Sequence, residues 1–219
     1  MVRVTLIGAG NVDFHYKTLL GFSDEKLTAH LDSIARALVS SGSELLVTPD
    51  DGVSFDIAKK YKFFGGKKVT GLVPVSDKRW GTKHIDKYLS EKINGKKVLD
   101  EVIDTLNWLE HDSTHNLFGD VTLCLAFSVG AMRELCGGYY LYKLFSGEKP
   151  EARIALERVN PKIVAGTKMP FHTIIYSSFV QESLPKEIEK YIGKYGCKVF
   201  YVGNAKELEG VLVNLPKTP

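Results

Sequence analysis

The stretch from Asp120 to Ala131, DVTLCLAFSVGA, indicates the fold class of the whole chain. Its first two thirds are a largely apolar run, typical in length and composition of a strand buried on both faces of a parallel sheet. Ser128 and Gly130 follow at once, and a segment with a helical pattern begins there. A buried strand that leads directly into a helix is the repeating unit of α/β proteins with a parallel sheet.

The same alternation extends in both directions from this stretch. Further strands are predicted at 2–7, 44–48, 68–73, 173–176 and 198–202. Helices are predicted at 23–42, 54–63, 108–118, 128–145 and 183–196, and from 204 onward. The pattern predicts an α/β fold, a three-layer Rossmann-like parallel sheet with helices on both faces, whose adjacent strands include 2–7, 44–48, 68–73 and 120–127. No repeat, linker or change in composition divides the chain, so residues 1–219 are expected to form a single domain.

Four segments have a less definite pattern. Residues 11–22 show no clear period, so no helix is expected directly after the first strand. Residues 77–97 are polar and interrupted by glycines, which favours a loop or an excursion from the fold. Residues 99–106 fit a helical period, although Val102 and Ile103 could also form a short strand, and residues 147–160 stay unassigned.

The composition bounds the function classes. The chain has 219 residues, of which 44% are hydrophobic and 25% charged, which excludes disordered, collagen-like and low-complexity proteins. Lys+Arg 29 against Asp+Glu 26 gives a net charge of +3, too small an excess to indicate nucleic acid or an anionic membrane as partner. A phosphorylated small molecule needs only a local positive site, so the charge balance leaves it open.

The cysteines and the N-terminus give further bounds. Cys124, Cys136 and Cys197 are scattered and odd in number, which argues against a disulfide framework or a zinc site. No apolar run is long enough to span a bilayer, and the first residues have the pattern of a strand and not of a signal peptide. A cytoplasmic location is therefore expected.

In an open parallel sheet, ligands bind outside the carboxyl ends of the strands, so the turns that follow the strands matter most. These turns are Gly8–Asn11, Thr48–Gly52, Pro74 and Ser128–Ala131. Small residues in three of them allow a ligand to approach the backbone.

The turn at Ser128 is the sharpest candidate for an anion site. The backbone N–H groups of Val129, Gly130 and Ala131 at a helix N-terminus would favour phosphate, and the Ser128 hydroxyl could add a donor. The alternative is that Gly130 only permits a tight turn from strand to helix.

The first glycine pair is a weaker signal. Gly8 and Gly10 lack the third glycine of a dinucleotide-binding turn, because Asp13 stands in its place. A Rossmann dehydrogenase is therefore not expected. Asn11 could contact a ribose or a base, or it could simply shape the turn.

Several segments, taken in order, resemble those of LOG-like proteins. They are Gly52–Tyr61 (GVSFDIAKKY), Gly65–Pro74 (GGKKVTGLVP), Glu101–Asp104, Asp120–Leu125 and Ser128–Leu135. LOG-like proteins are Rossmann-like nucleotide-binding proteins, and their superfamily includes the molybdenum-cofactor carrier proteins. The resemblance covers roughly residues 1 to 145 and continues more loosely to the end. It implies binding of a nucleoside phosphate or a phosphate-bearing cofactor, and it implies a homodimer.

The match departs from the family pattern at its chemical centre. Phe127 and Ser128 replace paired glycines, and Ala131 replaces a threonine, whereas Gly130 and Glu134 match. The family's catalytic members carry an arginine in the preceding helix, but the matching place here falls near His111 and holds no arginine. The turn after the second strand also carries Asp50 and Asp51 where the family usually has glycines, and two carboxylates would oppose a phosphate unless they face away or meet ribose hydroxyls.

The resemblance leaves three functional hypotheses. The first is a nucleotide-binding protein whose ligand contacts Gly8, Gly10, Asn11, Gly52, Ser128, Val129, Gly130 and Ala131. The second is a phosphoribohydrolase that uses Glu134 to cleave the N-glycosidic bond of nucleoside 5′-monophosphates. The third is a carrier of a cofactor without catalysis. No resident cofactor is expected in any of them.

Metal binding and assembly complete the expectations. His111 and His115 are four residues apart and would share a helix face, but a metal site needs a third ligand, and Asp112 is expected to point elsewhere. We therefore expect no metal. Trp108, Tyr139 and Tyr142 are large residues available for a homodimer surface.

Overall fold

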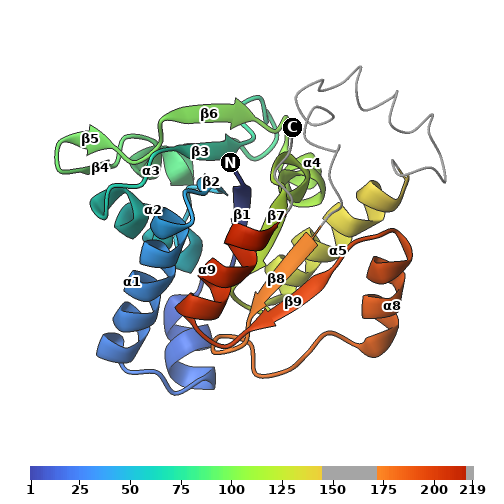
Figure 1. Ribbon diagram of the computed structural model, residues 1–219. Coiled ribbons are helices and arrows are strands. Elements are labelled where there is room, and N and C mark those ends of the chain that lie inside the picture. The colour runs from blue at the N-terminus through green and yellow to red at the C-terminus, as the bar shows by residue number, and fades with distance from the viewer. Residues whose placement is uncertain (145–171, 216–219) are drawn as a thin grey trace.

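Seven parallel strands form one sheet in the computed structural model, which describes residues 1–144 and 172–215 (Figure 1). Their order across the sheet is β6-β3-β2-β1-β7-β8-β9. The strands are β1 (Arg3–Ile7), β2 (Glu44–Val47), β3 (Val69–Val73), β6 (Glu101–Asp104), β7 (Val121–Cys124), β8 (His172–Tyr176) and β9 (Val199–Val202). The predicted adjacency of the strands now labelled β3, β2, β1 and β7 is confirmed, and so is the α/β fold class.

The strand order reverses at the centre of the sheet. β1 pairs in parallel with β2 on one side and with β7 on the other. The chain therefore adds β2, β3 and β6 in one direction from β1, and β7, β8 and β9 in the other. Such a reversal leaves a crevice at the carboxyl ends of the two central strands, which is where open α/β sheets bind ligands.

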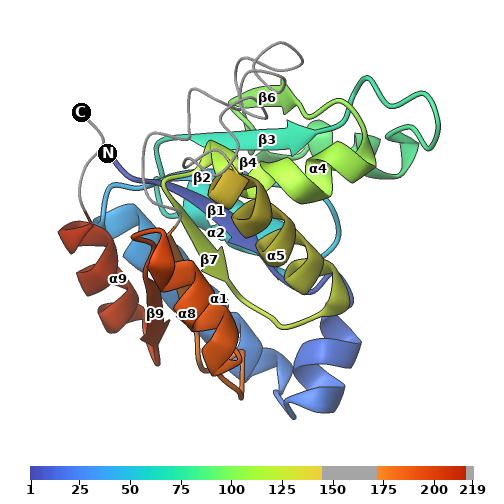
Figure 2. The same ribbon diagram turned by 90° about the vertical axis from the view of Figure 1, so that its right-hand side faces the viewer.

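Helices cover both faces of this sheet (Figures 1 and 2). One face carries α1 (Asp24–Ser40), α2 (Val53–Phe63) and α9 (Ala205–Asn214), and the other carries α4 (Trp108–Thr114), α5 (Val129–Lys143) and α8 (Lys186–Lys194). Each face has its own cluster of buried apolar side chains. The three layers follow from the sequence, since strands with buried residues on both faces need a helical cover on both sides.

The first helix shows how local sequence sets an element. Ser23 caps α1, with its hydroxyl oxygen accepting a hydrogen bond from the Lys26 N–H at 3.2 Å. Leu27, Leu31 and Ile34 are buried at helical spacing against the sheet. The cap and the apolar stripe together fix where the helix begins and which side it buries.

The segment after β1 differs from the expectation. The prediction that no helix follows the first glycine turn is wrong, because η1, a π-helix, spans Asp13–Leu19. Only Tyr16 of this helix is buried, and its hydroxyl donates to the Leu125 carbonyl at 2.8 Å. A helix anchored by one side chain leaves no apolar period, so the pattern could not reveal it.

Two of the other three indefinite segments contain short elements. Residues 77–97 hold η2 (Lys83–Ile85), α3 (Asp86–Leu89) and a hairpin of β4 (Lys92–Ile93) and β5 (Lys96–Lys97). The hairpin turns at Asn94 and Gly95, both with positive φ, a dipeptide that favours such turns. Residues 99–106 contain the strand β6, the second of the two alternatives that the sequence allowed.

Two parts of the sequence analysis lie outside the described residues. One is the segment 147–160, for which no element was predicted, and the other is the predicted end of a helix near Phe145. Within the described ranges, no helix combines the length and the apolar character that crossing a membrane requires.

Candidate functional site

A cleft of about 360 Å³ lies at the carboxyl ends of the central strands. Four segments line it: the turn after β1, the turn after β2, one side of α4 and the beginning of α5. The structure thus brings together most of the predicted site residues, namely Gly8, Gly10, Gly52, Ser128, Gly130, Ala131 and Glu134. Thr48, Trp108, His111 and Asp112 join them in the lining.

The beginning of α5 presents two backbone donors. Ser128 is the N-cap, and its hydroxyl oxygen accepts a hydrogen bond from the Ala131 N–H at 3.2 Å. The first helical bond runs from the Met132 N–H to the Ser128 carbonyl at 2.9 Å. The helix therefore leaves the N–H groups of Val129 and Gly130 unused, whereas the predicted donor Ala131 is already engaged.

Space is open beside those donors. A Cβ atom built on Gly130 would meet no atom within 4 Å, so no protein neighbour requires glycine there. The Val129 side chain is 91% exposed and does not line the cleft, so only its backbone can contribute to the site. This open position lies next to N–H groups that have no acceptor within the helix, so an anion can approach the helix terminus there.

At two of the other positions, Gly8 and Gly52, the structure explains why a glycine is needed. A Cβ on Gly8 would lie 2.7 Å from Val53 Cγ2. Gly52 has a φ of 131°, and its Cβ would lie 2.7 Å from the Ala9 carbonyl oxygen. These glycines let the turns after β1 and β2 pack against each other and so shape one wall of the cleft.

Asn11 lies apart from this cleft. Its side-chain oxygen accepts a hydrogen bond from the Phe14 N–H at 3.0 Å, at the beginning of η1. It lines an adjoining cavity of about 290 Å³, together with Asp13, Asp50 and Asp51. Of the two roles weighed for Asn11, the structure supplies the contact by which it shapes the turn.

Acidic groups dominate the charge of the cleft. Asp50, Asp51, Asp112 and Glu134 line it, and the described lining residues include no lysine or arginine. Asp51 is partly neutralised, since it accepts a hydrogen bond from the Tyr88 hydroxyl and lies 3.8 Å from the Lys87 ammonium.

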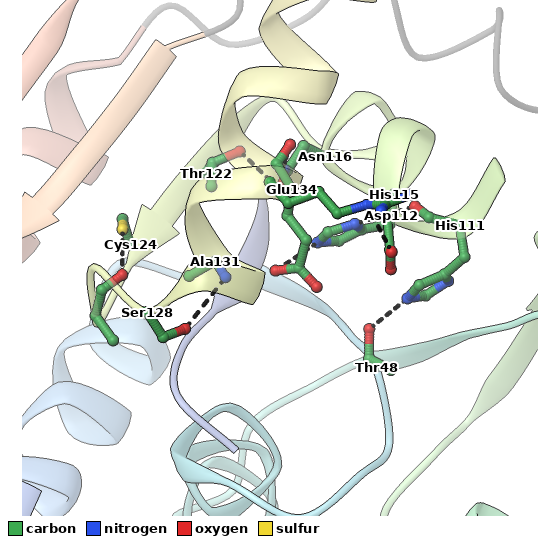
Figure 3. A network of polar contacts seen from close by, with 12 residues as sticks. Thr48, His111, Asp112, His115, Asn116, Thr122, Cys124, Ser128, Ala131 and Glu134 are labelled. Atoms are coloured by element: carbon green, nitrogen blue, oxygen red, sulfur yellow. Dashed lines mark hydrogen bonds and ion pairs between the residues drawn. The ribbon is translucent and has the colours of Figure 1, made fainter. Parts of the chain in front are cut away.

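Glu134, on α5, lines the cleft, and Figure 3 shows its carboxyl group beside the His115 ring. Burial, with the nearby carboxylate of Asp112 as a smaller cause, raises the pKa of Glu134 to about 8. Asp112 itself pairs with Arg133, at 2.9 Å between Nε and Oδ2. The Glu134 backbone carbonyl accepts a hydrogen bond from the Asn116 side chain at 2.9 Å, which ties α5 to the preceding 3-10 helix η3 (His115–Phe118).

Two buried histidines lie beside Glu134 (Figure 3). The rings of His111 and His115 are nearly parallel, at 8°, with centroids 5.1 Å apart. His111 Nε2 is 2.8 Å from the Thr48 hydroxyl, and its Nδ1 is 2.9 Å from the Thr105 hydroxyl. Burial lowers the pKa of His111, and it lowers the pKa of His115 to about 4, so both rings are neutral near pH 7.

His115 has one nitrogen without a partner. Its Nδ1 lies 3.2 Å from the His111 backbone carbonyl, which can only accept, so Nδ1 carries the proton. Its Nε2 is buried, has no hydrogen-bond partner among the described residues and faces Glu134 Oε2 at 3.7 Å. A buried acceptor left unpaired costs about 1–3 kcal/mol, so this nitrogen calls for a physical explanation.

The residues expected at a dimer surface have partners within the chain. Tyr142 is buried in the core, and the Trp108 indole N–H donates to the Gly81 carbonyl at 2.9 Å. The Tyr139 hydroxyl donates to the Tyr191 carbonyl. Trp108 and Tyr139 are nevertheless partly exposed, so only the buried Tyr142 is withdrawn from a possible surface, and the homodimer stays a prediction.

Comparison with solved structures supports the fold assignment. The structural-genomics target TM1055 superposes with a TM-score of 0.57 at 15% identity, over 97% of this chain and 98% of that one. The molybdenum cofactor carrier protein from Chlamydomonas reinhardtii gives 0.53 at 14% identity, over 96% and 95%. The molybdenum cofactor binding protein from the phototrophic bacterium Rippkaea orientalis gives 0.51 at 11% identity, over 96% and 94%.

Identities this low establish likeness of fold only. No family model and no curated protein sequence matches the chain. The chain shares its fold with these proteins, and this is the kind of fold that its motifs implied.

Proposed function

We propose that the cleft binds a phosphate-bearing small molecule, a nucleoside phosphate or a cofactor of similar chemistry, with its phosphate at the beginning of α5. The observation that carries the proposal is the beginning of α5, where the helix offers no acceptor to the N–H groups of Val129 and Gly130 and where Gly130 lines the cleft with open space at its Cβ position. Backbone donors and the helix dipole favour an anion at this place. Structural neighbours described as carrying or binding the molybdenum cofactor support a small-molecule ligand.

The rest of the cleft suits the uncharged part of such a ligand. A volume of about 360 Å³ is within the range of small-molecule sites. Asp50 and Asp51, at the turn after β2, can accept hydrogen bonds from ribose hydroxyls. Trp108 also lines the cleft and offers an aromatic surface.

A second candidate function is hydrolysis of the N-glycosidic bond of nucleoside 5′-monophosphates. Glu134 favours it, because this carboxyl group lies in the same cleft as the proposed phosphate site and on the same helix, one turn further on. The arginine of the family's catalytic members has no counterpart here. His111 lies near the matching place in the sequence and lines the cleft.

The test is a panel of nucleoside 5′-monophosphates measured twice at matched salt. Calorimetry reports binding, and a coupled assay reports release of ribose 5-phosphate. Binding without release supports a binding or carrier protein, whereas release that is lost in Glu134→Gln supports the hydrolase. If neither inorganic phosphate nor any nucleotide of the panel binds, the proposed phosphate site is wrong.

A further inference from the structure

Three neighbouring side chains, two of which line the cleft, are the starting point. His111 on α4, His115 on η3 and Glu134 on α5 each offer a ligand atom, and these atoms lie within 4.8 Å of one another. Figure 3 shows the three side chains converging between α4 and α5. The phosphate site proposed above uses neither histidine, so their approach to Glu134 needs its own account.

His115 is already in the form that binds a metal. Its Nδ1–H donates to the His111 backbone carbonyl, so its Nε2 carries a lone pair. Metal-binding histidines generally donate their other ring N–H to a carbonyl or carboxylate in this way, which fixes the tautomer and the ring orientation. The lone pair is buried and without a hydrogen-bond partner among the described residues.

His111 is oriented in a similar manner. Thr105 and Thr48 hold its two ring nitrogens, at 2.9 and 2.8 Å. A threonine hydroxyl can donate or accept, so Nδ1 can carry the proton toward Thr105 and leave the lone pair on Nε2. An ion at Nε2 would replace the hydrogen bond from Thr48.

The distances fit a shared ion better than a hydrogen bond. His115 Nε2 and Glu134 Oε2 are 3.7 Å apart, too far for a hydrogen bond. Two atoms that each lie about 2.1 Å from one zinc ion are at most about 4.2 Å apart, so this pair is within range. The largest separation in the group is 4.8 Å, which requires a contraction of roughly 1 Å.

We propose that His111, His115 and Glu134 form a binding site for one divalent metal ion of the zinc type. Two imidazoles and one carboxylate are a ligand set of zinc sites that keep a further position open. His111 and Glu134 line the cleft, so the open position would face the ligand.

The charge of the cleft indicates what a metal ion would do there. This part of the inference rests on the proposed function. Asp50, Asp51 and Asp112 line the cleft, and no lysine or arginine is found among the described lining residues, which is unfavourable for a phosphate-bearing ligand. A divalent cation bound to Glu134 would offset this charge and could take an oxygen of the ligand into its open position.

The experiment measures the metal alone. Protein stripped with a chelator is titrated with Zn²⁺ by calorimetry at pH 7.5, without any nucleotide. We expect one ion per chain and a loss of affinity of at least tenfold in both Glu134→Gln and His115→Gln, since even outer partners of a metal site affect affinity by about 10–100-fold. Co²⁺ should give the visible bands of a site with few ligands, and these bands should be lost in the same variants.

A matched control separates this site from other histidines. His30 lies on α1, on the other face of the sheet, where its Nδ1 contacts the Tyr176 hydroxyl at 3.0 Å. His30→Gln should bind Zn²⁺ like the wild type. Glu134→Gln keeps the size of the side chain, so it serves if the fully buried His115 cannot be replaced without unfolding.

Two results would overturn the proposal. One is a wild-type protein that binds no zinc, and the other is a folded Glu134→Gln variant that binds it as tightly as the wild type. Neither result bears on phosphate binding, because nucleotides are absent from the titration. Equally, a failure of nucleotide binding leaves the zinc measurement interpretable.

Discussion

The Ser128 hydroxyl oxygen accepts a hydrogen bond from the Ala131 N–H at 3.2 Å and so caps the helix at the inner wall of the cleft. This contact gives Ser128 a structural role at the place where the sequence suggested a donor to phosphate. The two roles can be separated by substitution, because a cap needs an acceptor whereas an anion needs the absence of negative charge.

The first prediction uses this difference. Ser128→Ala should lower the free energy of unfolding by about 1 kcal/mol, because the cap is lost. Ser128→Asp keeps an acceptor and should leave the protein as stable as the wild type, yet it should weaken nucleotide binding through charge repulsion. Urea denaturation and calorimetry on the two variants check both statements. If a stable Ser128→Asp protein binds nucleotides as tightly as the wild type, no anion binds at the N-terminus of α5.

The second prediction concerns Gly130. Asp fits there sterically, since a Cβ would meet nothing within 4 Å, and a negative charge in the first turn stabilises a helix. Gly130→Asp should therefore fold normally and lose more than tenfold in affinity for a phosphate-bearing ligand, because a charge-assisted hydrogen bond is worth about 1.5–3 kcal/mol.

Gly210→Asp is the matched control for this substitution. Gly210 lies on α9, on the other face of the sheet, and its Cβ position is equally open. Its binding curve should overlay that of the wild type. If Gly130→Asp also binds like the wild type, the phosphate lies elsewhere, and the turn Gly8–Asn11 is the next place to examine.

Much of the fold could be predicted because its strands are buried on both faces. Such strands form apolar runs that stand out against polar turns, and the order of helices and strands then indicates a parallel sheet. Most of the candidate cleft followed as well, since the carboxyl ends of neighbouring strands meet at one edge. Gly8, Gly52 and Gly130 were assigned to one site on this ground, and all three line the same cleft.

The contacts between helices could not be predicted in this way. The spacing of His111 and His115 placed them on one helix face, but their third neighbour, Glu134, comes from another helix. The packing of α4 and η3 against α5 brings them together, and no local pattern encodes that approach. The helix η1 after Asn11 was likewise hidden, because it buries only Tyr16.

The third prediction compares two glycines. Gly52→Ala should destabilise the protein by about 1–3 kcal/mol, because its φ is 131° and the new Cβ would lie 2.7 Å from the Ala9 carbonyl oxygen. Gly210→Ala, in open space on α9, should instead stabilise it by about 0.5–1 kcal/mol. Urea denaturation gives both values. Equal stabilities for the two variants would contradict the close approach of the turns after β1 and β2.

The last prediction concerns acid stability and His172. This side chain is 4% exposed, and its Nδ1 accepts a hydrogen bond from the Lys198 N–H at 3.0 Å. Burial, and to a lesser degree the Lys198 charge, lowers the pKa of His172. Below about pH 6.5 the unfolded chain therefore takes up a proton that the folded chain resists, so the free energy of unfolding should fall as the pH falls, by at most about 1.4 kcal/mol per pH unit from this residue.

His172→Asn isolates this contribution. The amide oxygen of Asn can accept the hydrogen bond from Lys198 but does not titrate. The variant should therefore be less stable than the wild type at every pH, because the ring packing is lost. Its free energy of unfolding should fall less than that of the wild type on acidification. The measurement is the free energy of unfolding by urea at pH 7.5 and at pH 5.5, for the wild type and the variant. The other buried histidines titrate in both proteins and cancel in the comparison. A fall between the two pH values that is as large in His172→Asn as in the wild type would show that His172 contributes nothing to acid sensitivity.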